Sequence, residues 1–263
     1  MESLPFAKKN CQGQLISSQQ LLKQLYLDTF IHRLRHRPIK DDLQYLKEIK
    51  EELCQKRLNI ASCNKTPPWT VNQLMKVLSK LKNGKSRDPH GMINELFKPG
   101  VCGTDLQDSL LMMLNQSKLE IDIPKFMEIA YFVSIYKGKG EKIDLQNDRG
   151  IFIVNILRSI LMKLVYGDKY EMVDKNMSDS NVGARKFKNI RNHIFEFNDV
   201  IRNPRRESID MEILDYRQCF DSMWMEEVIN DLWEAGIQDD NLSLIARVNE
   251  AVEVSVKTPF GKN

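Results

Sequence analysis

The sequence predicts a helix-rich α+β fold of the globular kind. Hydrophobic residues make up 42% of the 263 positions and charged residues 29%, which excludes a disordered chain. Apolar residues recur at helical spacing over most of the chain, whereas a few short segments alternate apolar and polar residues as strands do. The longest apolar runs, at 129–136 and 160–167, are far too short to span a bilayer.

Helices are predicted over most of the first half of the chain. Apolar stripes at helical spacing mark two helices over 17–60, and Pro38 separates them. Thr70 and Gln73 then form the capping-box pattern that opens a third helix. The helices expected after this opening lie over 71–82, from residue 92, and over 104–119.

The second half alternates strands with helices. The strand pattern of 129–136 is followed by a glycine-containing turn, which predicts a hairpin. Another strand pattern covers 208–215, and Gly236 closes the helix after it as a C-terminal cap. The helices expected here lie over 155–177, 189–202, 225–236 and 239–250, and a last strand over 252–258.

The cysteines indicate a reducing compartment. There are five, an odd number, and they are widely spaced without a CxxC pair. We therefore expect free thiols with no disulfide partner and no zinc site, in the nucleus or the cytoplasm. The N-terminus has no apolar segment after its charges, so we expect neither a secretory signal nor a membrane partner.

Charge is distributed unevenly although the net charge is only +3. Residues 73–98 hold six Lys/Arg against two acidic residues, and residues 185–206 hold seven against two. Residues 207–240 then hold eleven Asp/Glu against the single Arg217. The basic stretches could hold phosphates, and the acidic stretch could hold a divalent metal ion. The alternative is that these charges only lie on solvated helix faces.

The segment at 211–224, MEILDYRQCFDSMW, is the most informative for chemistry. Its strand pattern ends on Asp215, and the chain then turns through aromatic and small residues to Phe220. A carboxylate at a strand end is a good metal ligand, because the sheet fixes its oxygens while the turn leaves room for a substrate. By itself, an aspartate at such a position is more often a turn former or a helix cap.

This segment resembles motif A of the reverse transcriptases of non-LTR retrotransposons. Four further blocks resemble that family in the family's order: 81–98, 123–151, 181–195 and 252–263. The resemblance implies the fingers and a partial palm of a right-hand polymerase, incomplete in this sequence. It divides the chain into a helical linker at 1–68, a fingers-like region at 69–206 and a partial palm with motif A at 207–263.

The resemblance also implies roles for single residues. Asp215 would be the catalytic carboxylate and the ligand of two Mg²⁺ ions, and Tyr216 would bind the nucleotide through its backbone. Phe220 would be the steric gate under the sugar, with an ordinary core phenylalanine as the alternative. Arg149 would clamp the triphosphate of the incoming dNTP, and Lys137 would add charge there unless it is merely a solubilising turn residue.

The basic block before motif A would hold the RNA template and the DNA primer, through Arg185, Lys186 and Arg191. Several positions depart from the family pattern, among them Asp148 and Phe187. Asp148 replaces a tyrosine, which puts a carboxylate next to Arg149 in sequence. Phe187 replaces a glycine, a residue that indicates a turn or a close approach of the backbone to nucleic acid.

The sequence lacks the later aspartate pair with which the family completes its metal site. Asp239-Asp240 is the only pair after Asp215, and it has the pattern of a helix start. We therefore expect a polymerase fragment that is inactive alone. A catalytically dead remnant that only binds nucleic acid and an unrelated helical domain are the alternatives. If the site assignment holds, Asp215 ends a strand of a small antiparallel sheet, and Phe220 faces Arg149.

Overall fold

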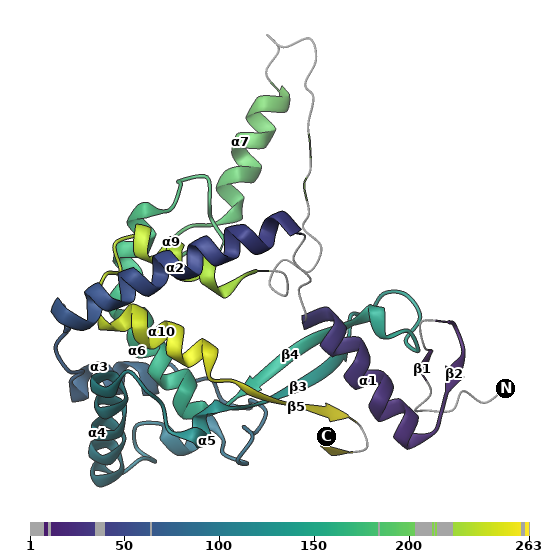
Figure 1. Cartoon of the computed structure of the whole chain (residues 1–263), viewed down its shortest axis with the longest axis horizontal. Helices are drawn as coiled ribbons and strands as arrows, with labels where there is room; N and C mark the ends of the chain where they lie inside the picture. The colour runs from purple at the N-terminus through teal and green to yellow at the C-terminus, as the bar shows by residue number, and fades with distance from the viewer. Residues whose placement is uncertain are drawn as a thin grey trace.

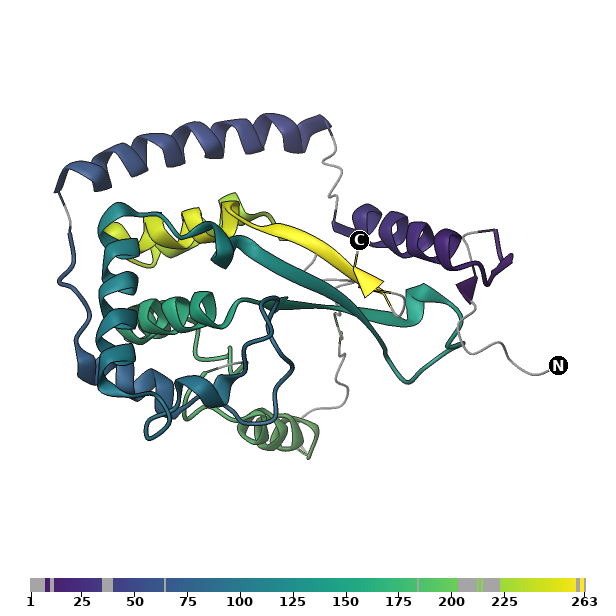
Figure 2. The ribbon, with the colours of Figure 1, turned by 90° about the horizontal axis from the view of Figure 1, so that it is seen from below.

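The structure is a computed structural model that describes residues 8–9, 12–34, 40–63, 65–183, 185–202, 212, 214, 223–258 and 261–262. It confirms the helix-rich α+β class, with a group of packed helices from which a small mixed sheet extends (Figures 1 and 2). None of the described helices is long and apolar enough to cross a membrane. Cys54 and Cys102 carry free thiols, and burial raises the pKa of the Cys102 thiol.

The sheet has the strand order β4-β3-β5-β6. Strand β3 (Ile129–Tyr136) pairs antiparallel with β4 (Asp148–Val154) and parallel with β5 (Glu253–Thr258), and β5 pairs antiparallel with the two-residue β6 (Gly261–Lys262). A separate two-stranded ribbon joins β1 (Lys8–Lys9) to β2 (Leu15–Ile16). The predicted strands at 129–136 and 252–258 are confirmed, and most of 208–215 lies outside the described residues.

The helices follow the predicted order with small differences at their ends. The expected helix over 71–82 ends at Ser79, and the one expected from residue 92 is a short 3-10 helix. The helices are α1 (Gln19–Leu34), α2 (Lys40–Cys63), α3 (Val71–Ser79), α4 (Thr104–Glu120), α5 (Lys125–Glu128), α6 (Ile156–Asn176), α7 (Ile190–Arg202), α9 (Met225–Glu234) and α10 (Asp240–Glu250), with 3-10 helices η1 (Asn94–Phe97) and η2 (Leu145–Asn147).

The main core joins the two ends of the chain. Ile49 and Leu53 of α2 belong to the same buried cluster as apolar residues of α3, α4, α6, α9 and α10. Polar contacts reinforce this packing, since Lys56 of α2 donates to Asn230 of α9 at 2.7 Å. Helix α2 therefore shares a core with segments nearly 200 positions later. The fully buried side chains of this core include Leu74, Leu78, Leu114, Ile160, Leu161, Leu164, Ile229 and Leu242.

Helix α6 begins inside this core, where its first amide groups need acceptors. Asn155 is the N-cap, and its side chain accepts hydrogen bonds from the backbone of Leu157 and Arg158. Asp88, which is 4% exposed, accepts from the backbone N–H groups of Ile156, His90 and Met92. One carboxylate thus ties the loop before η1 to the start of α6.

A smaller core covers one face of the sheet. Tyr26 of α1 packs with Phe132 of β3, Leu145 of η2 and Val256 of β5. Gly150 of β4 lies under the Phe132 ring. A Cβ atom on residue 150 would come within 2.1 Å of that ring, so only glycine fits at this position. Helix α1 therefore shields this face, while the tip of the opposite face remains exposed at Ile135 and Ile151.

We expect Asp88→Ala to lower the free energy of unfolding by about 1–3 kcal/mol, because it leaves three amide groups without their acceptor, and that of Ile156 is buried. Urea unfolding followed by circular dichroism measures this. Asp108→Ala, on the exposed surface of α4, is the control and should change stability by less than about 0.5 kcal/mol. An equal loss in the two variants would show that the Asp88 hydrogen bonds do not stabilise the start of α6.

Candidate nucleic-acid interface

The residues predicted for the site fall into three groups. Asp215, Tyr216 and Phe220 lie outside the described residues. Lys137 and Arg149 belong to the β3–β4 hairpin, before α6. The third group, Arg185, Lys186 and Arg191, follows α6, whose 21 residues span about 30 Å. The two described groups therefore lie toward opposite ends of α6.

The β3–β4 hairpin brings Lys137 and Arg149 to the same face. Arg149 pairs with Ile135 of the neighbouring strand, and Lys137 lies two residues after Ile135. Because side chains alternate between the two faces of a sheet, all three lie on the same face. This is the face opposite α1. Lys137 is fixed at the loop end, where its backbone N–H donates to Asn147 at 2.8 Å and its Nζ to the carbonyl of Gln146 at 3.0 Å.

Glycines shape the turn of this hairpin as the sequence predicts. Gly138 and Gly140 have φ of 78° and 79°, a left-handed conformation that glycine adopts without steric cost. The Tyr136 hydroxyl donates to the carbonyl of Gly140 at 2.5 Å and holds the turn against the strand. The turn thus presents Lys137 on an ordered loop.

Asp148 lies on the opposite face from Arg149, although the two are neighbours in sequence. Its buried carboxylate accepts from Lys8 at 3.1 Å and from the Ser134 hydroxyl at 2.5 Å. Burial, and to a smaller extent the Asp148 charge, raise the pKa of Tyr26 to about 12. Strand alternation therefore separates this carboxylate from the Arg149 guanidinium, which is exposed.

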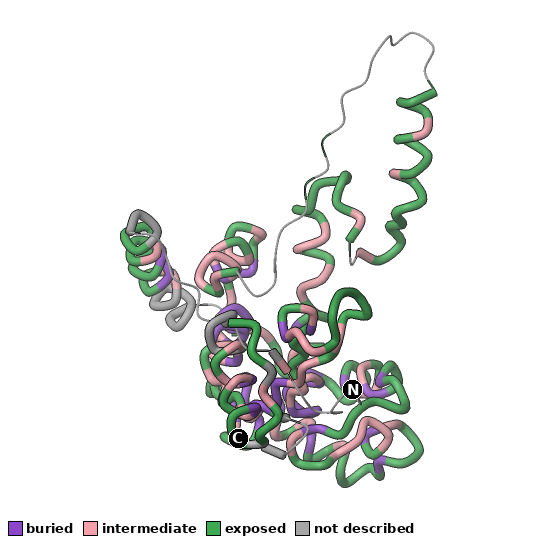
Figure 3. The backbone as a smooth tube through the Cα atoms, turned by 90° about the vertical axis from the view of Figure 1, so that its right-hand side faces the viewer, coloured by how far each residue is buried: buried purple, intermediate pink, exposed green. Residues whose placement is uncertain are grey.

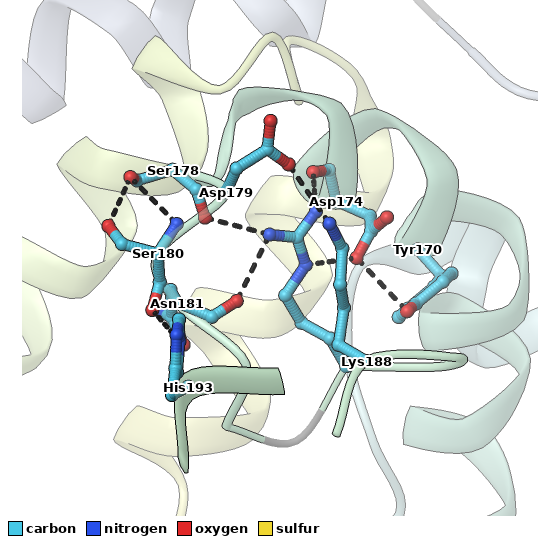
Figure 4. A network of polar contacts seen from close by, with 9 residues as sticks. Tyr170, Asp174, Ser178, Asp179, Ser180, Asn181, Lys188 and His193 are labelled. Carbon is cyan, nitrogen blue, oxygen red and sulfur yellow. Dashed lines mark hydrogen bonds and ion pairs between the residues drawn. The ribbon is translucent and has the colours of Figure 1, made fainter. Parts of the chain in front are cut away.

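The Arg185 side chain holds together the loop between α6 and α7, residues 177–189. Figure 4 shows several residues of this polar network, among them Asp174, Ser178 and Asn181. The Arg185 Nε donates to the Asp174 carboxylate at 2.8 Å, and its Nη atoms donate to the carbonyls of Asp174, Ser178 and Asn181. The Arg185 side chain is only 6% exposed. The hydrogen bond to Arg185 lowers the pKa of the Asp174 carboxyl. Arg185 therefore shapes the loop, and a phosphate would have to compete with these acceptors.

Lys186 follows Arg185 and is exposed. Its Nζ lies 3.8 Å from the centroid of the Tyr170 ring and 5.7 Å from that of Tyr166. Its backbone N–H donates to the Tyr170 hydroxyl at 2.7 Å. The two tyrosines of α6 thus hold the Lys186 ammonium group at the surface by cation–π attraction.

Phe187 adopts φ of 62°, a left-handed conformation that is uncommon for residues other than glycine. Its side chain is fully exposed, with a relative accessibility of 103%. Neither the positive φ nor the complete exposure of the ring was predicted from the sequence.

Helix α7 extends from this loop and carries Arg191. None of its residues is buried, and it stands away from the helical core (Figures 1 and 3). His193 joins α7 to the loop, with Nδ1 3.0 Å from Glu196 Oε2 and Nε2 2.7 Å from the carbonyl of Ser180. Both ring nitrogens face acceptors, so the protonated imidazole satisfies both contacts.

Asp239 and Asp240 confirm the predicted helix start. The Asp239 carboxylate caps α10 by accepting from the backbone of Asn241 at 3.0 Å, and it also binds Lys169. Asp240 accepts from the backbone N–H and the hydroxyl of Thr66. These carboxylates are used in structural contacts and do not fit the role of Mg²⁺ ligands. No cluster of three or more His, Cys, Asp or Glu able to hold a metal ion occurs within the described part of the chain.

No protein-family model matches the chain, and a search of curated proteins finds no match.

We expect the pKa of His193 to lie above its ordinary value near 6.5, because Glu196 and the Ser180 carbonyl favour the protonated ring more than desolvation and the Lys188 charge oppose it. Protonation therefore stabilises the contact between α7 and the loop below about pH 6.5, and this contribution is lost as the pH rises through the raised value. An NMR titration of the imidazole, assigned with His193→Gln, measures it. Glu196→Gln should lower the pKa, and a midpoint at or below 6.5 in the parent chain would contradict the geometry.

Proposed function

We propose that the chain is the fingers and partial palm of an RNA-directed DNA polymerase of the non-LTR retrotransposon type, which binds a primer–template and a dNTP. The observation that carries the proposal is the β3–β4 hairpin. It aligns Lys137 and Arg149 on one face and turns the neighbouring carboxylate of Asp148 to the other. The ordered sequence blocks give these two cations their proposed partner, the triphosphate.

The hairpin face suits a phosphate ligand. A guanidinium presents paired N–H donors that match two phosphate oxygens, and Arg149 lies exposed on its strand. Ile135 and Ile151 flank it at 48% and 43% exposure, so its neighbours on this face are apolar and do not compete for the cation. Lys137 adds a second positive charge at the loop end.

The second basic region would hold the nucleic-acid backbone. Residues 174–196 carry five Lys/Arg against three Asp/Glu. Two of these carboxylates, Asp174 and Asp179, are bound by Arg185 and Lys188, and Glu196 by His193. Lys175, Lys186 and Arg191 then supply the excess positive charge, which attracts phosphates and releases their counterions.

In the proposed reaction, a primer 3′-hydroxyl attacks the α-phosphate of the dNTP and pyrophosphate leaves. Mg²⁺ would neutralise the phosphates in this chemistry, with Asp215 as its ligand by resemblance. Asp239 and Asp240 are held in contacts with Lys169 and Thr66 and do not fit as further Mg²⁺ ligands. That observation favours a second candidate function, a remnant that binds nucleic acid without catalysis.

We expect the chain to bind single-stranded RNA with an affinity that falls steeply with salt. Lys186→Ala and Arg191→Ala should each make the slope of log K against log salt shallower by about 0.7, the value for one phosphate contact on a single strand. Fluorescence anisotropy with a labelled U20 RNA over a range of KCl concentrations measures this. Lys47→Ala, on the outer face of α2, is the control, and salt-independent binding would contradict the proposal.

We expect the chain by itself not to extend a DNA primer on an RNA template, in Mg²⁺ or in Mn²⁺. Asp215 alone cannot fix the ions, because Mg²⁺ is held by several oxygen ligands and keeps its waters otherwise. A gel-based primer-extension assay compares the chain with Asp215→Ala. Extension that Asp215→Ala abolishes would contradict this expectation, and it would exclude the candidate function of binding without catalysis.

A further inference from the structure

Phe187 is an exposed aromatic residue held in an unfavourable backbone conformation. Two described residues other than glycine have positive φ, Ile121 at 53° and Phe187 at 62°. Ile121 has a structural reason, since it is the left-handed C-cap of α4 and its N–H donates to the carbonyls of Ser117 and Lys118. Phe187 is instead fully exposed, so burial does not compensate for its strain.

The surroundings of Phe187 are fixed. Arg185 binds three carbonyls and the Asp174 carboxylate on its N-terminal side. Lys186 is held by its backbone and its ammonium group against the Tyr170 ring. Lys188, on the other side, forms an ion pair with Asp179 at 3.0 Å. Ordered neighbours on both sides thus keep the strained residue in place and its ring in solvent.

We propose that Phe187 is a stacking platform for an unpaired base of single-stranded nucleic acid. The proposal rests on the proposed nucleic-acid binding and deepens it by naming the base-contacting residue. An aromatic ring offers a flat face to a base of any sequence, and the cations around it attract the phosphates on either side of that base. The excess positive charge of this segment favours nucleic acid over an uncharged apolar protein partner.

Two substitutions separate the ring from the backbone strain. Phe187→Ala removes the ring but keeps the Cβ atom, so the left-handed conformation stays strained. Phe187→Gly removes the ring and also the Cβ atom that causes the strain. We expect both variants to bind U20 RNA about ten-fold more weakly than the parent chain, since stacking on one base accounts for that order of affinity. Phe187→Gly should in addition raise the melting temperature by about 2–4 °C, which Phe187→Ala should not. Phe187→Trp should retain the parent affinity.

A strand of twenty abasic nucleotides, with the same number of phosphates, tests the contact with the base. Phe187→Ala should bind it as the parent chain does. Tyr45→Ala, which removes a half-exposed ring on α2, should leave binding to both strands unchanged. If Phe187→Ala binds U20 as tightly as the parent chain, the stacking role of Phe187 is overturned. Salt-dependent binding by the parent chain would in that case still support the proposed function. An equal loss on the abasic strand would also overturn the stacking role, and no salt-dependent binding by the parent chain would overturn both the role and the proposed function.

Discussion

The buried start of α6 holds together the helical core, the loop before η1 and the β3–β4 hairpin. A helix that begins inside a core must find acceptors for amide groups that water cannot reach. Asn155 and Asp88 supply them, and Asp88 draws the loop before η1 into the same contact. Strand β4 ends immediately before Asn155, so this cap also fixes the direction in which the β3–β4 hairpin leaves the core.

The far end of α6 positions the second basic region in the same way. Tyr170 and Asp174 lie on its last turns, where they bind Lys186 and Arg185 respectively. The helix thus connects a hairpin with two cations on one face to a loop with an exposed aromatic ring. At the hairpin, the Asp148 carboxylate is bound by Lys8 and does not neutralise Lys137 or Arg149. At the loop, Arg185 is paired with Asp174, so Lys186 and Arg191 carry the available positive charge.

Local patterns predicted much of this fold. The capping box of Thr70 and Gln73, the helix start at Asp239 and the glycine turn at 138–140 depend on neighbours in sequence, and all three are confirmed. The packing of α2 on α9 and the parallel pairing of β3 with β5 were not predicted, because they join distant segments. For the same reason, the sequence could not show that Asp148 faces Lys8. The carbonyl acceptors of Arg185 are near in sequence, but they lie in an irregular loop whose conformation follows no periodic pattern. The predicted metal ligand Asp215 stays a prediction.

We propose that single-stranded nucleic acid binds at the loop after α6, whereas the β3–β4 hairpin holds the triphosphate of the dNTP. Ultraviolet crosslinking of the full chain to a uridine-rich RNA, followed by mass spectrometry of the crosslinked peptides, tests the first of these contacts. We expect crosslinks in the peptide that contains Phe187. Crosslinks confined to the exposed surface of α4 or α2, or no crosslinks under conditions of saturating RNA, would contradict it.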